Sequence, residues 1–245
     1  MAELRSPFDL SGKHVLINGA AGGIGSATAM LCASLGARLT LVDIVDSAGL
    51  AERVFAAGGK AARHQFDTSD RSNVETLRQR VGPVDALVDA AGFCPFNEWT
   101  APDWDEAFDK VFDVNVRGPI NMVRAFMPAM IERKAGRIVL VGSIAGRMGG
   151  LRASAHYSAS KGAVHTLVRW FAQRATPHGV MVNAVAPGAT DTGMIAGGNY
   201  DVSGFPQKRL LRSEEIAAPI AFLCSEGASG IAGVVLDANG GMHFS

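Results

Sequence analysis

The stretch His14–Leu35 reads HVLINGAAGGIGSATAMLCASL, and it is the strongest indicator of the fold. It begins with a short apolar run, continues through the glycine spacing G-x-x-x-G-x-G, and ends in a segment of helical composition. The glycines of this turn are Gly19, Gly23 and Gly25, and Ile24 lies at the predicted helix start. Glycine lets the backbone approach a pyrophosphate closely, and a helix N-terminus offers free N–H groups and a partial positive charge. The stretch therefore predicts a dinucleotide-binding turn, although an ordinary tight turn has the same pattern.

A second strand is expected at Arg38–Asp43, and its last residue is acidic. A carboxylate at this place can accept hydrogen bonds from both adenosine ribose hydroxyls, and it repels a 2′-phosphate. Ile44 follows, and the glycine turn contains no Lys or Arg that would neutralise such a phosphate. Asp43 therefore favours NAD over NADP, with a plain strand-end carboxylate as the alternative. Asp67 ends the third expected strand and could bond the adenine amino group or only cap the strand.

Apolar, β-branched runs alternate with longer amphipathic stretches along the chain. Most of these runs are apolar on both faces, as is typical of strands buried between two helical layers. We therefore expect an α/β fold over residues 1–245, in which a single domain holds a doubly wound parallel sheet of about seven strands with helices on both faces. The expected strands are His14–Asn18, Arg38–Asp43, Arg63–Asp67, Ala86–Ala90, Arg137–Gly142, Val180–Val185 and Val234–Asp237, and the expected helices are Ile24–Leu35, Ser47–Ala57, Ser72–Arg80, Trp104–Arg133, His156–Ala175 and Ser213–Leu223.

The composition excludes several classes of protein. Lys plus Arg and Asp plus Glu number 23 each, so there is no basic surplus for a dedicated nucleic-acid binder. Three scattered cysteines suit neither a disulfide framework nor a zinc site. The N-terminal MAELRSPFDL lacks the apolar core of a secretory signal, and no apolar run approaches the ~18 residues of a membrane span. We expect a cytoplasmic protein with a small-molecule substrate and no membrane or nucleic-acid partner.

The segment Thr190–Arg209 interrupts the strand–helix rhythm. It reads TDTGMIAGGNYDVSGFPQKR, is rich in glycine and follows a strand. A long irregular insert in a compact domain is usually functional or disordered, and ligands of open α/β folds bind at the carboxyl ends of the strands. We expect this segment to be a mobile lid over the substrate.

Tyr157 and Lys161 are four residues apart in HYSASKGAV, on one face of a predicted helix. A free phenol has a pKa of about 10 and is a poor base at neutral pH. An ammonium one turn away and an oxidised nicotinamide would both stabilise the phenolate and lower that pKa. Tyr157 is therefore a candidate general acid/base for a hydroxyl or carbonyl group, with Ser143 positioned to hold the substrate oxygen. The alternatives are a surface helix pair and a turn serine.

Other catalytic motifs are not present. VGSIAG has Val141 where a G-x-S-x-G nucleophile elbow needs its first glycine, and Gly59-Lys60 is followed by Ala61 instead of the Ser or Thr of a P-loop. The histidines are spread out, with no H-E-x-x-H. We therefore expect metal-independent chemistry.

Taken together, the chain resembles the short-chain dehydrogenase/reductase family in its compact, Rossmann-type form, over essentially its full length. The motifs that carry the resemblance are NGAAGGIG for the family's T-G-x-x-x-G-x-G, Asp89-Ala90-Ala91-Gly92 for its N-N-A-G, Asn115 in FDVNVRG, then Ser143, Tyr157 and Lys161, Pro187-Gly188 followed by Thr190 and Thr192, and the C-terminal LDANGGM.

The resemblance implies roles that spacing alone does not. Tyr157 would be the acid/base, Ser143 would orient the substrate oxygen, and Lys161 would bind the nicotinamide ribose and perturb Tyr157. Asn115 would hold a water that extends a proton relay. The implied cofactor contacts are Gly19, Gly23, Ile24, Gly25, Asp43, Asp67, Ala91, Gly92, Tyr157, Lys161, Pro187, Gly188, Thr190 and Thr192.

Three departures from the family pattern stand out. Asn18 replaces a threonine and Asp89 replaces an asparagine, at the ends of adjacent predicted strands. We expect them to compensate, with the Asn18 amide donating to the Asp89 carboxylate or its neighbouring backbone. The Ser143–Tyr157 spacing is one residue longer than usual, which would reshape the pocket floor within Met148–Ser154, and the lid is several residues shorter.

The substrate is the least determined feature. By family position the pocket is mostly apolar, which favours a secondary alcohol or ketone oxidised or reduced with NAD. The alternatives are a 3-oxoacyl-thioester (acyl carrier protein) reductase and, from another class, a non-catalytic NAD-sensing protein. The family usually forms homotetramers or dimers. The expected substrate contacts are Ser143, Ala145, Phe93, Gly149 and Met194, and further pocket candidates are Cys94, Pro95, Arg147, Gly150 and Ile195.

Overall fold

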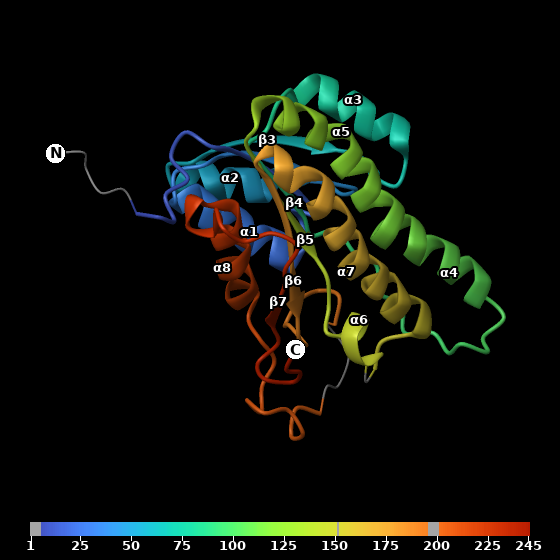
Figure 1. Ribbon diagram of the computed structural model, residues 1–245. Helices are drawn as coiled ribbons and strands as arrows, with labels where there is room; N and C mark the ends of the chain where they lie inside the picture. Colours follow the sequence, from blue (N-terminus) through green and yellow to red (C-terminus); the bar gives the residue numbers. More distant parts are fainter. Residues whose placement is uncertain (1–5, 151, 196–200) are drawn as a thin grey trace.

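The structure is a computed structural model that describes residues 6–150, 152–195 and 201–245 (Figure 1). Within these ranges seven strands form one sheet in the order β3-β2-β1-β4-β5-β6-β7. Every neighbouring pair is parallel. The strands are β1 (His14–Asn18), β2 (Arg38–Asp43), β3 (Lys60–Gln65), β4 (Ala86–Asp89), β5 (Gly136–Val141), β6 (Val180–Pro187) and β7 (Val235–Ala238).

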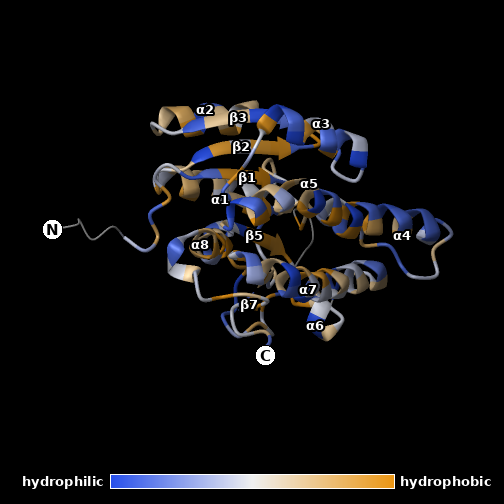
Figure 2. Cartoon of the chain, turned by 45° about the horizontal axis from the view of Figure 1, so that its top comes forward, coloured by the Kyte–Doolittle hydropathy of each residue, from blue (hydrophilic) through white to orange (hydrophobic). Residues whose placement is uncertain are grey.

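Helices cover both faces of this sheet, as Figures 1 and 2 show. One layer contains α1, α2 and α8, and the other contains α3, α5 and α7. This arrangement confirms the predicted fold class. The helices are α1 (Gly23–Ser34), α2 (Ala48–Ala56), α3 (Arg71–Val81), α4 (Trp104–Phe112), α5 (Gly118–Arg133), α6 (Ala145–Met148), α7 (Ala155–Ala175) and α8 (Ser213–Cys224), with a π-helical turn η1 (Asp113–Arg117) and the 3₁₀ turns η2 (Thr176–His178) and η3 (Glu226–Ala228).

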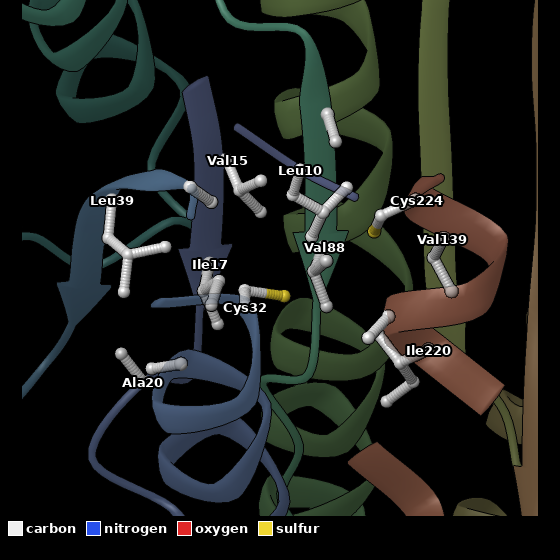
Figure 3. Close-up of a cluster of buried hydrophobic side chains, with 14 of the residues drawn as sticks. Leu10, Val15, Ile17, Ala20, Cys32, Leu39, Val88, Val139, Ile220 and Cys224 are labelled. Atoms are coloured by element: carbon white, nitrogen blue, oxygen red, sulfur yellow. The ribbon is translucent and has the colours of Figure 1, made fainter. Parts of the chain in front are cut away.

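The core is divided between the two faces by the alternation of side chains along each strand. In β1, Val15 and Ile17 pack with α1 and α8, whereas Leu16 packs on the opposite side with α5. Figure 3 shows the first of these clusters, in which Cys32 of α1 and Ile220 of α8 meet the central strands. Because both faces are buried, the central strands are mostly apolar, as the orange of β5 in Figure 2 shows.

The chain reverses direction across the sheet at β1, which pairs with β2 on one side and with β4 on the other. The loops after β1 and β4 therefore leave the sheet toward opposite helical layers, and a crevice opens between them at the carboxyl ends of the strands. Asn18 and Asp89, the last residues of β1 and β4, are register partners at this point.

Most predicted element boundaries differ from the structure by no more than two residues, and two predicted elements differ by more. Strand β3 begins and ends earlier than Arg63–Asp67, because it is a half-exposed edge strand with little apolar pattern. The helix expected over Trp104–Arg133 is divided by the π turn η1. Such a turn contains one extra residue, which leaves no mark in the hydrophobic pattern and often lies at a functional site.

None of the described helices is both long enough and apolar enough to span a lipid bilayer.

A core substitution tests the two-layer packing. Ile138 of β5 is fully buried. We expect Ile138→Ala to lower the free energy of unfolding by about 2–5 kcal/mol, because it removes buried methyl groups and leaves a cavity. Urea denaturation measures this loss. The control Phe55→Ala, on the exposed face of α2, should change the free energy much less, and an equal loss in both variants would contradict the assigned packing.

Candidate active site

A cleft of about 1030 Å³ lies at the carboxyl ends of the strands. It is continuous from the turn after β1 to the segment after β6, so one cavity contacts nearly every motif that the sequence singled out. The predicted residues that line it are Gly19, Gly23, Ile24, Gly25, Asp43, Asp67, Ala91, Gly92, Phe93, Ser143, Ala145, Tyr157, Lys161, Pro187, Gly188, Thr190, Thr192 and Met194.

The glycine turn is tightly packed against the end of β4. Gly19 has a φ of +75°, and a Cβ there would lie 2.4 Å from the Ala91 nitrogen. A Cβ on Gly25 would lie 2.0 Å from the Gly19 carbonyl oxygen. Neither position can carry a side chain without moving the main chain, which explains the spacing of the glycines.

Asp43 holds this turn from the side of β2. Its Oδ2 accepts a hydrogen bond from the Ala21 N–H at 2.8 Å, and its Oδ1 accepts one from the Val45 N–H at 3.1 Å. Each carboxylate oxygen keeps a further lone pair for another donor. Asp67 also lines the cleft, two residues beyond the end of β3, where its Oδ1 accepts from the backbone and hydroxyl of Ser69.

The residues around this turn fit a dinucleotide. The N-terminus of α1 has no side-chain cap, and its first turn contains no acidic residue. Its N–H groups and its partial positive charge are therefore available for an anion such as a pyrophosphate. Asp43 stands where a ribose would follow. Pro187, Gly188, Thr190 and Thr192 also line the cleft, and Thr192 lies against Gly23 of the turn.

Tyr157 and Lys161 lie one turn apart on α7 and line the same cleft as Ser143. The Lys161 Nζ lies 5.7 Å from the centre of the Tyr157 ring and donates to the Val141 carbonyl at 2.8 Å. Burial lowers the pKa of Lys161 to about 8, and the Asp89 carboxylate opposes this shift. The Ser143 Oγ accepts from the Ala145 N–H at 3.1 Å, so its own proton remains available to a ligand.

Asn115 lies in the π turn behind this wall and does not itself line the cleft. Its Oδ1 accepts from the Phe93 N–H at 2.8 Å, while its Nδ2 donates to the Phe93 carbonyl and to the Ser160 Oγ. The amide therefore joins the loop after β4 to α7. Ser160 carries no signal in the sequence that would have revealed this role.

The compensation expected between Asn18 and Asp89 is confirmed. The Asn18 Nδ2 lies 3.1 Å from the Asp89 Oδ1 and also 3.1 Å from the Thr68 Oγ1. Burial raises the pKa of Asp89 to about 6, although the hydrogen bond from Asn18 opposes this rise. The two departures from the family pattern thus form one buried pair at the carboxyl ends of β1 and β4.

His165 is a neighbour of the site that the sequence analysis missed. The Ser143 N–H donates to its Nε2 at 3.4 Å, and a Cβ on Gly142 would lie 2.4 Å from the same nitrogen. Burial, together with the charges of Arg147, Lys161 and Arg169, lowers the pKa of His165 to about 4. The ring is therefore neutral at ordinary pH and can accept this hydrogen bond. His165 lies one helical turn beyond Lys161 on α7, and this spacing could have identified it in the sequence.

Three pocket candidates lie outside the cleft. Gly149 ends α6 in a left-handed conformation and presents its carbonyl to Ser158, while its neighbour Gly150 lines the cleft. Arg147 points to the last strand, where it bonds Asp237 at 3.0 Å and the Val235 carbonyl at 2.7 Å. Pro95 is likewise not among the lining residues. Turn geometry sets the orientation of Gly149, and a partner far along the chain sets that of Arg147.

The first residues of the expected lid, Thr190–Arg209, lie against the glycine turn. A Cβ on Gly23 would lie 2.8 Å from the Thr192 Cγ2, and one on Gly92 would lie 3.6 Å from the Met194 Cε. Thr190 forms a bridge with Leu211, two residues beyond the other end of the segment. Residues 196–200, including Gly197 and Gly198, and residue 151 within the pocket-floor segment lie outside the described residues. The described residues contain no group of three or more His, Cys, Asp or Glu side chains arranged to hold a metal ion.

A pair of glycine substitutions tests the close approach at the turn. Gly19 and Gly12 both have positive φ, but a Cβ on Gly12 would meet no atom within 4 Å. We expect Gly12→Ala to cost about 1–2 kcal/mol of unfolding free energy from backbone strain, and Gly19→Ala to cost about 1–3 kcal/mol more from the clash with Ala91. Thermal and urea denaturation measure both, and equal losses would contradict the clash.

Comparison with known proteins gives a consistent result. The family described as "short chain dehydrogenase" matches residues 13–201. The chain is 35% identical over 240 residues to the cis-4-hydroxycyclohexanecarboxylate dehydrogenase of Sinomonas cyclohexanicum, which covers 92% of this chain and 94% of that protein.

Two solved structures have the same fold. A 3-oxoacyl-[acyl-carrier protein] reductase from Brucella melitensis with bound NAD has a TM-score of 0.89 and 28% identity, covering 100% of this chain and 98% of that one. A 3-oxoacyl (acyl-carrier-protein) reductase from Agrobacterium tumefaciens C58 with NADP bound has a TM-score of 0.90 and 28% identity, covering 98% and 99%. The motif order, the sheet topology and these matches agree, and the chain belongs to the short-chain dehydrogenase/reductase family of oxidoreductases.

Proposed function

We propose that this protein transfers a hydride between NAD(H) and a secondary alcohol or ketone, with Tyr157 as general acid/base and without a metal. The observation that carries the proposal is that Tyr157, Lys161 and Ser143 line the same cleft as the glycine turn and Asp43. When bound, the nicotinamide would accept or supply the hydride. The protein must then bind the dinucleotide, orient the substrate oxygen and move its proton.

The proton transfer is assigned to the Tyr157 hydroxyl. In the oxidative direction its oxygen takes the proton of the substrate hydroxyl, and in the reductive direction it returns a proton to the carbonyl oxygen. The Lys161 ammonium beside the ring favours the phenolate by electrostatic attraction. The Ser143 hydroxyl donates a hydrogen bond to the same substrate oxygen and fixes its position, while its own oxygen accepts from the Ala145 N–H.

Asn115 is assigned a supporting part in the proton path. Its side-chain amide is occupied by Phe93 and Ser160, so the contact to a relay water falls to the main chain of the π turn. Gly19, Gly23, Ile24 and Gly25 are assigned to the pyrophosphate, and the segment Thr190–Arg209 to a lid that covers the substrate.

The choice of NAD rests on the charge distribution at the adenosine end. Asp43 is followed by the exposed side chains of Ile44 and Val45, which offer nothing to a 2′-phosphate. Among the described residues that line the cleft, Arg152 and Lys161 carry the positive charges; the charge of Arg152 acts on Asp201, and Lys161 donates to the Val141 carbonyl. A carboxylate without a cation beside it favours ribose hydroxyls over phosphate.

The substrate region of the cleft is largely apolar. Phe93, Phe96, Met194, Ile195 and Phe205 line it, which suits a substrate with a hydrophobic body. A 3-oxoacyl-thioester reductase is the second candidate, favoured by the names of both solved relatives. Strong preference for NADPH would support that candidate. An NAD-sensing protein without catalysis, from another class, is disfavoured because Ser143, Tyr157 and Lys161 are all present.

We further propose a homo-oligomeric, cytoplasmic enzyme that folds as a single domain, on the resemblance to the family. Apolar residues of α5 and α7 do not support an interface by themselves, because they pack in the core. Val164, Val168 and Phe171 of α7 are buried in the core against the sheet, and Ile120 and Leu167 pack partly against the same cluster. Size-exclusion chromatography with light scattering measures the state directly.

Replacing Tyr157 by Phe tests the catalytic assignment. We expect kcat for alcohol oxidation with NAD to fall by at least about a hundredfold, because a general acid/base contributes roughly 10²–10⁴ in rate. Binding of NAD, followed by fluorescence titration, should be retained. Undiminished turnover in the variant would refute the assignment. A wild-type protein that binds NAD but turns over no member of a panel of secondary alcohols and ketones would point to the sensor.

Replacing Asp43 by Asn tests the cofactor preference. The loss of charge-assisted hydrogen bonds to the ribose should raise the KM for NAD about ten- to a hundredfold, and the loss of repulsion should improve the use of NADP. The measured quantity is the ratio of kcat/KM for the two cofactors with one alcohol. As a control, Asp46→Asn removes a nearby carboxylate that pairs with Arg63 instead, and should leave this ratio near the wild-type value. An NADP preference in the wild type would overturn the assignment of Asp43.

A further inference from the structure

Asp89 is a buried carboxylate behind Asn18, Ala90 and Ala91, which line the cleft, and the proposed reaction does not use it. It is 2% exposed. Its Oδ1 accepts from the Asn18 Nδ2 at 3.1 Å and from the Ala91 N–H at 3.3 Å. Its Oδ2 is buried and has no hydrogen-bond partner among the described residues. A carboxylate with half of its acceptor capacity unused is costly to bury, so its charge needs an electrostatic partner.

Lys161 of α7 is the buried cation that reaches the end of the neighbouring strand. It is 4% exposed, and its Nζ donates to the carbonyl of Val141 at the end of β5. Asp89 is the register partner of Leu140, the residue immediately before Val141. The Nζ also lies 3.7 Å from the position of a Cβ on Gly92, three residues after Asp89. The two charges are therefore held at the ends of adjacent strands, and each shifts the titration of the other.

The other titratable groups around Lys161 are neutral near pH 7. Burial raises the pKa of the Cys94 thiol to about 11, so no thiolate forms there. Burial lowers the pKa of His165 to about 4, so its ring carries no charge, and the charged groups Arg147, Arg169 and Asp237 face that ring. Tyr157 is a phenol until it gives up its proton. Asp89, with a pKa raised by burial to about 6, is ionised at neutral pH and is the remaining negative charge that acts on Lys161.

We propose that the Asp89 carboxylate is a positioning residue that acts as the counter-ion of Lys161, keeping its ammonium protonated in a buried site and thereby lowering the pH at which Tyr157 ionises. This role deepens the proposed dehydrogenase function and rests on it. The family pattern has a neutral asparagine at this position, so the charge is a property of this chain. Asp89 acts through Lys161 and touches neither substrate nor cofactor.

The direction of the effect follows from the order of the titrations. Lys161 loses its proton as the pH rises through about 8, and without the carboxylate this loss would begin at lower pH. In that range the phenol would face a neutral amine and would ionise only at higher pH. On the acid side, protonation of Asp89 below about pH 6 has no such consequence, because Lys161 is fully charged there. The contribution of Asp89 therefore falls between about pH 6, below which the carboxyl is protonated, and about pH 8, above which Lys161 is neutral in either protein.

A titration of Tyr157 in two proteins tests this role. The chain contains two tyrosines, so Tyr200→Phe leaves Tyr157 as the only one. In this background, Asp89→Asn removes the charge while keeping the size and the Oδ1 acceptor for Asn18. We expect the midpoint of tyrosinate formation, measured by ultraviolet absorbance with and without NAD, to rise by roughly one pH unit. The rise of kcat/KM with pH for alcohol oxidation should move in the same direction by a similar amount.

The other outcomes are equally decisive. An unchanged midpoint would mean that Asp89 only joins two strand ends, and a lower midpoint would mean that its charge repels the phenolate directly; either overturns the counter-ion role. The control Asp105→Asn removes an exposed carboxylate of α4 and should leave the midpoint in place. If Asp89→Asn alone folds poorly, as judged by circular dichroism, the double variant Asn18→Thr with Asp89→Asn restores the family's pair and is titrated in its place.

The absorbance titration does not depend on turnover, so the two proposals can fail separately. A shifted midpoint in a protein that oxidises no alcohol would reject the dehydrogenase function and keep the electrostatic coupling. An active dehydrogenase whose midpoint is the same in both proteins would reject the counter-ion and keep the function.

Discussion

The buried ammonium of Lys161 is the constraint around which the site is organised. A cation that is almost entirely removed from water loses its hydration, and the protein must replace it with oriented oxygen atoms and a nearby negative charge. The carbonyl of Val141 supplies the first and the carboxylate of Asp89 the second. Both lie at the carboxyl ends of adjacent strands, so the position of the ammonium depends on the parallel sheet itself.

The glycine turn depends on the same strand ends. Gly19 packs directly against the main chain at Ala91, and Asp89 bonds the N–H of Ala91. The glycine turn and the strand ends around Lys161 are thus packed against each other. Asn18 couples them further, because its amide reaches from β1 to both Asp89 and Thr68.

Polar side chains behind the cleft hold its walls in place. The side-chain amide of Asn115 hydrogen-bonds the Phe93 backbone and Ser160, and His165 accepts from the backbone N–H of Ser143. Arg147 and Asp237 join the turn after Ser143 to the last strand. These residues need never contact a substrate, yet their hydrogen bonds help to hold the reacting groups in place.

Residue order alone was sufficient to determine the fold class and to bring the main motifs to one cleft. Glycine spacing, a strand-end carboxylate and the four-residue interval between Tyr157 and Lys161 are local patterns, and parallel strands carry such patterns to a common edge. Other features depend on contacts between distant segments. The π turn at Asn115 requires one extra residue that no periodicity records, His165 acts through the backbone of Ser143, and Arg147 finds its partner on β7. The charge state of Lys161 was likewise decided by tertiary structure, because it depends on burial and on a carboxylate 72 positions earlier in the chain.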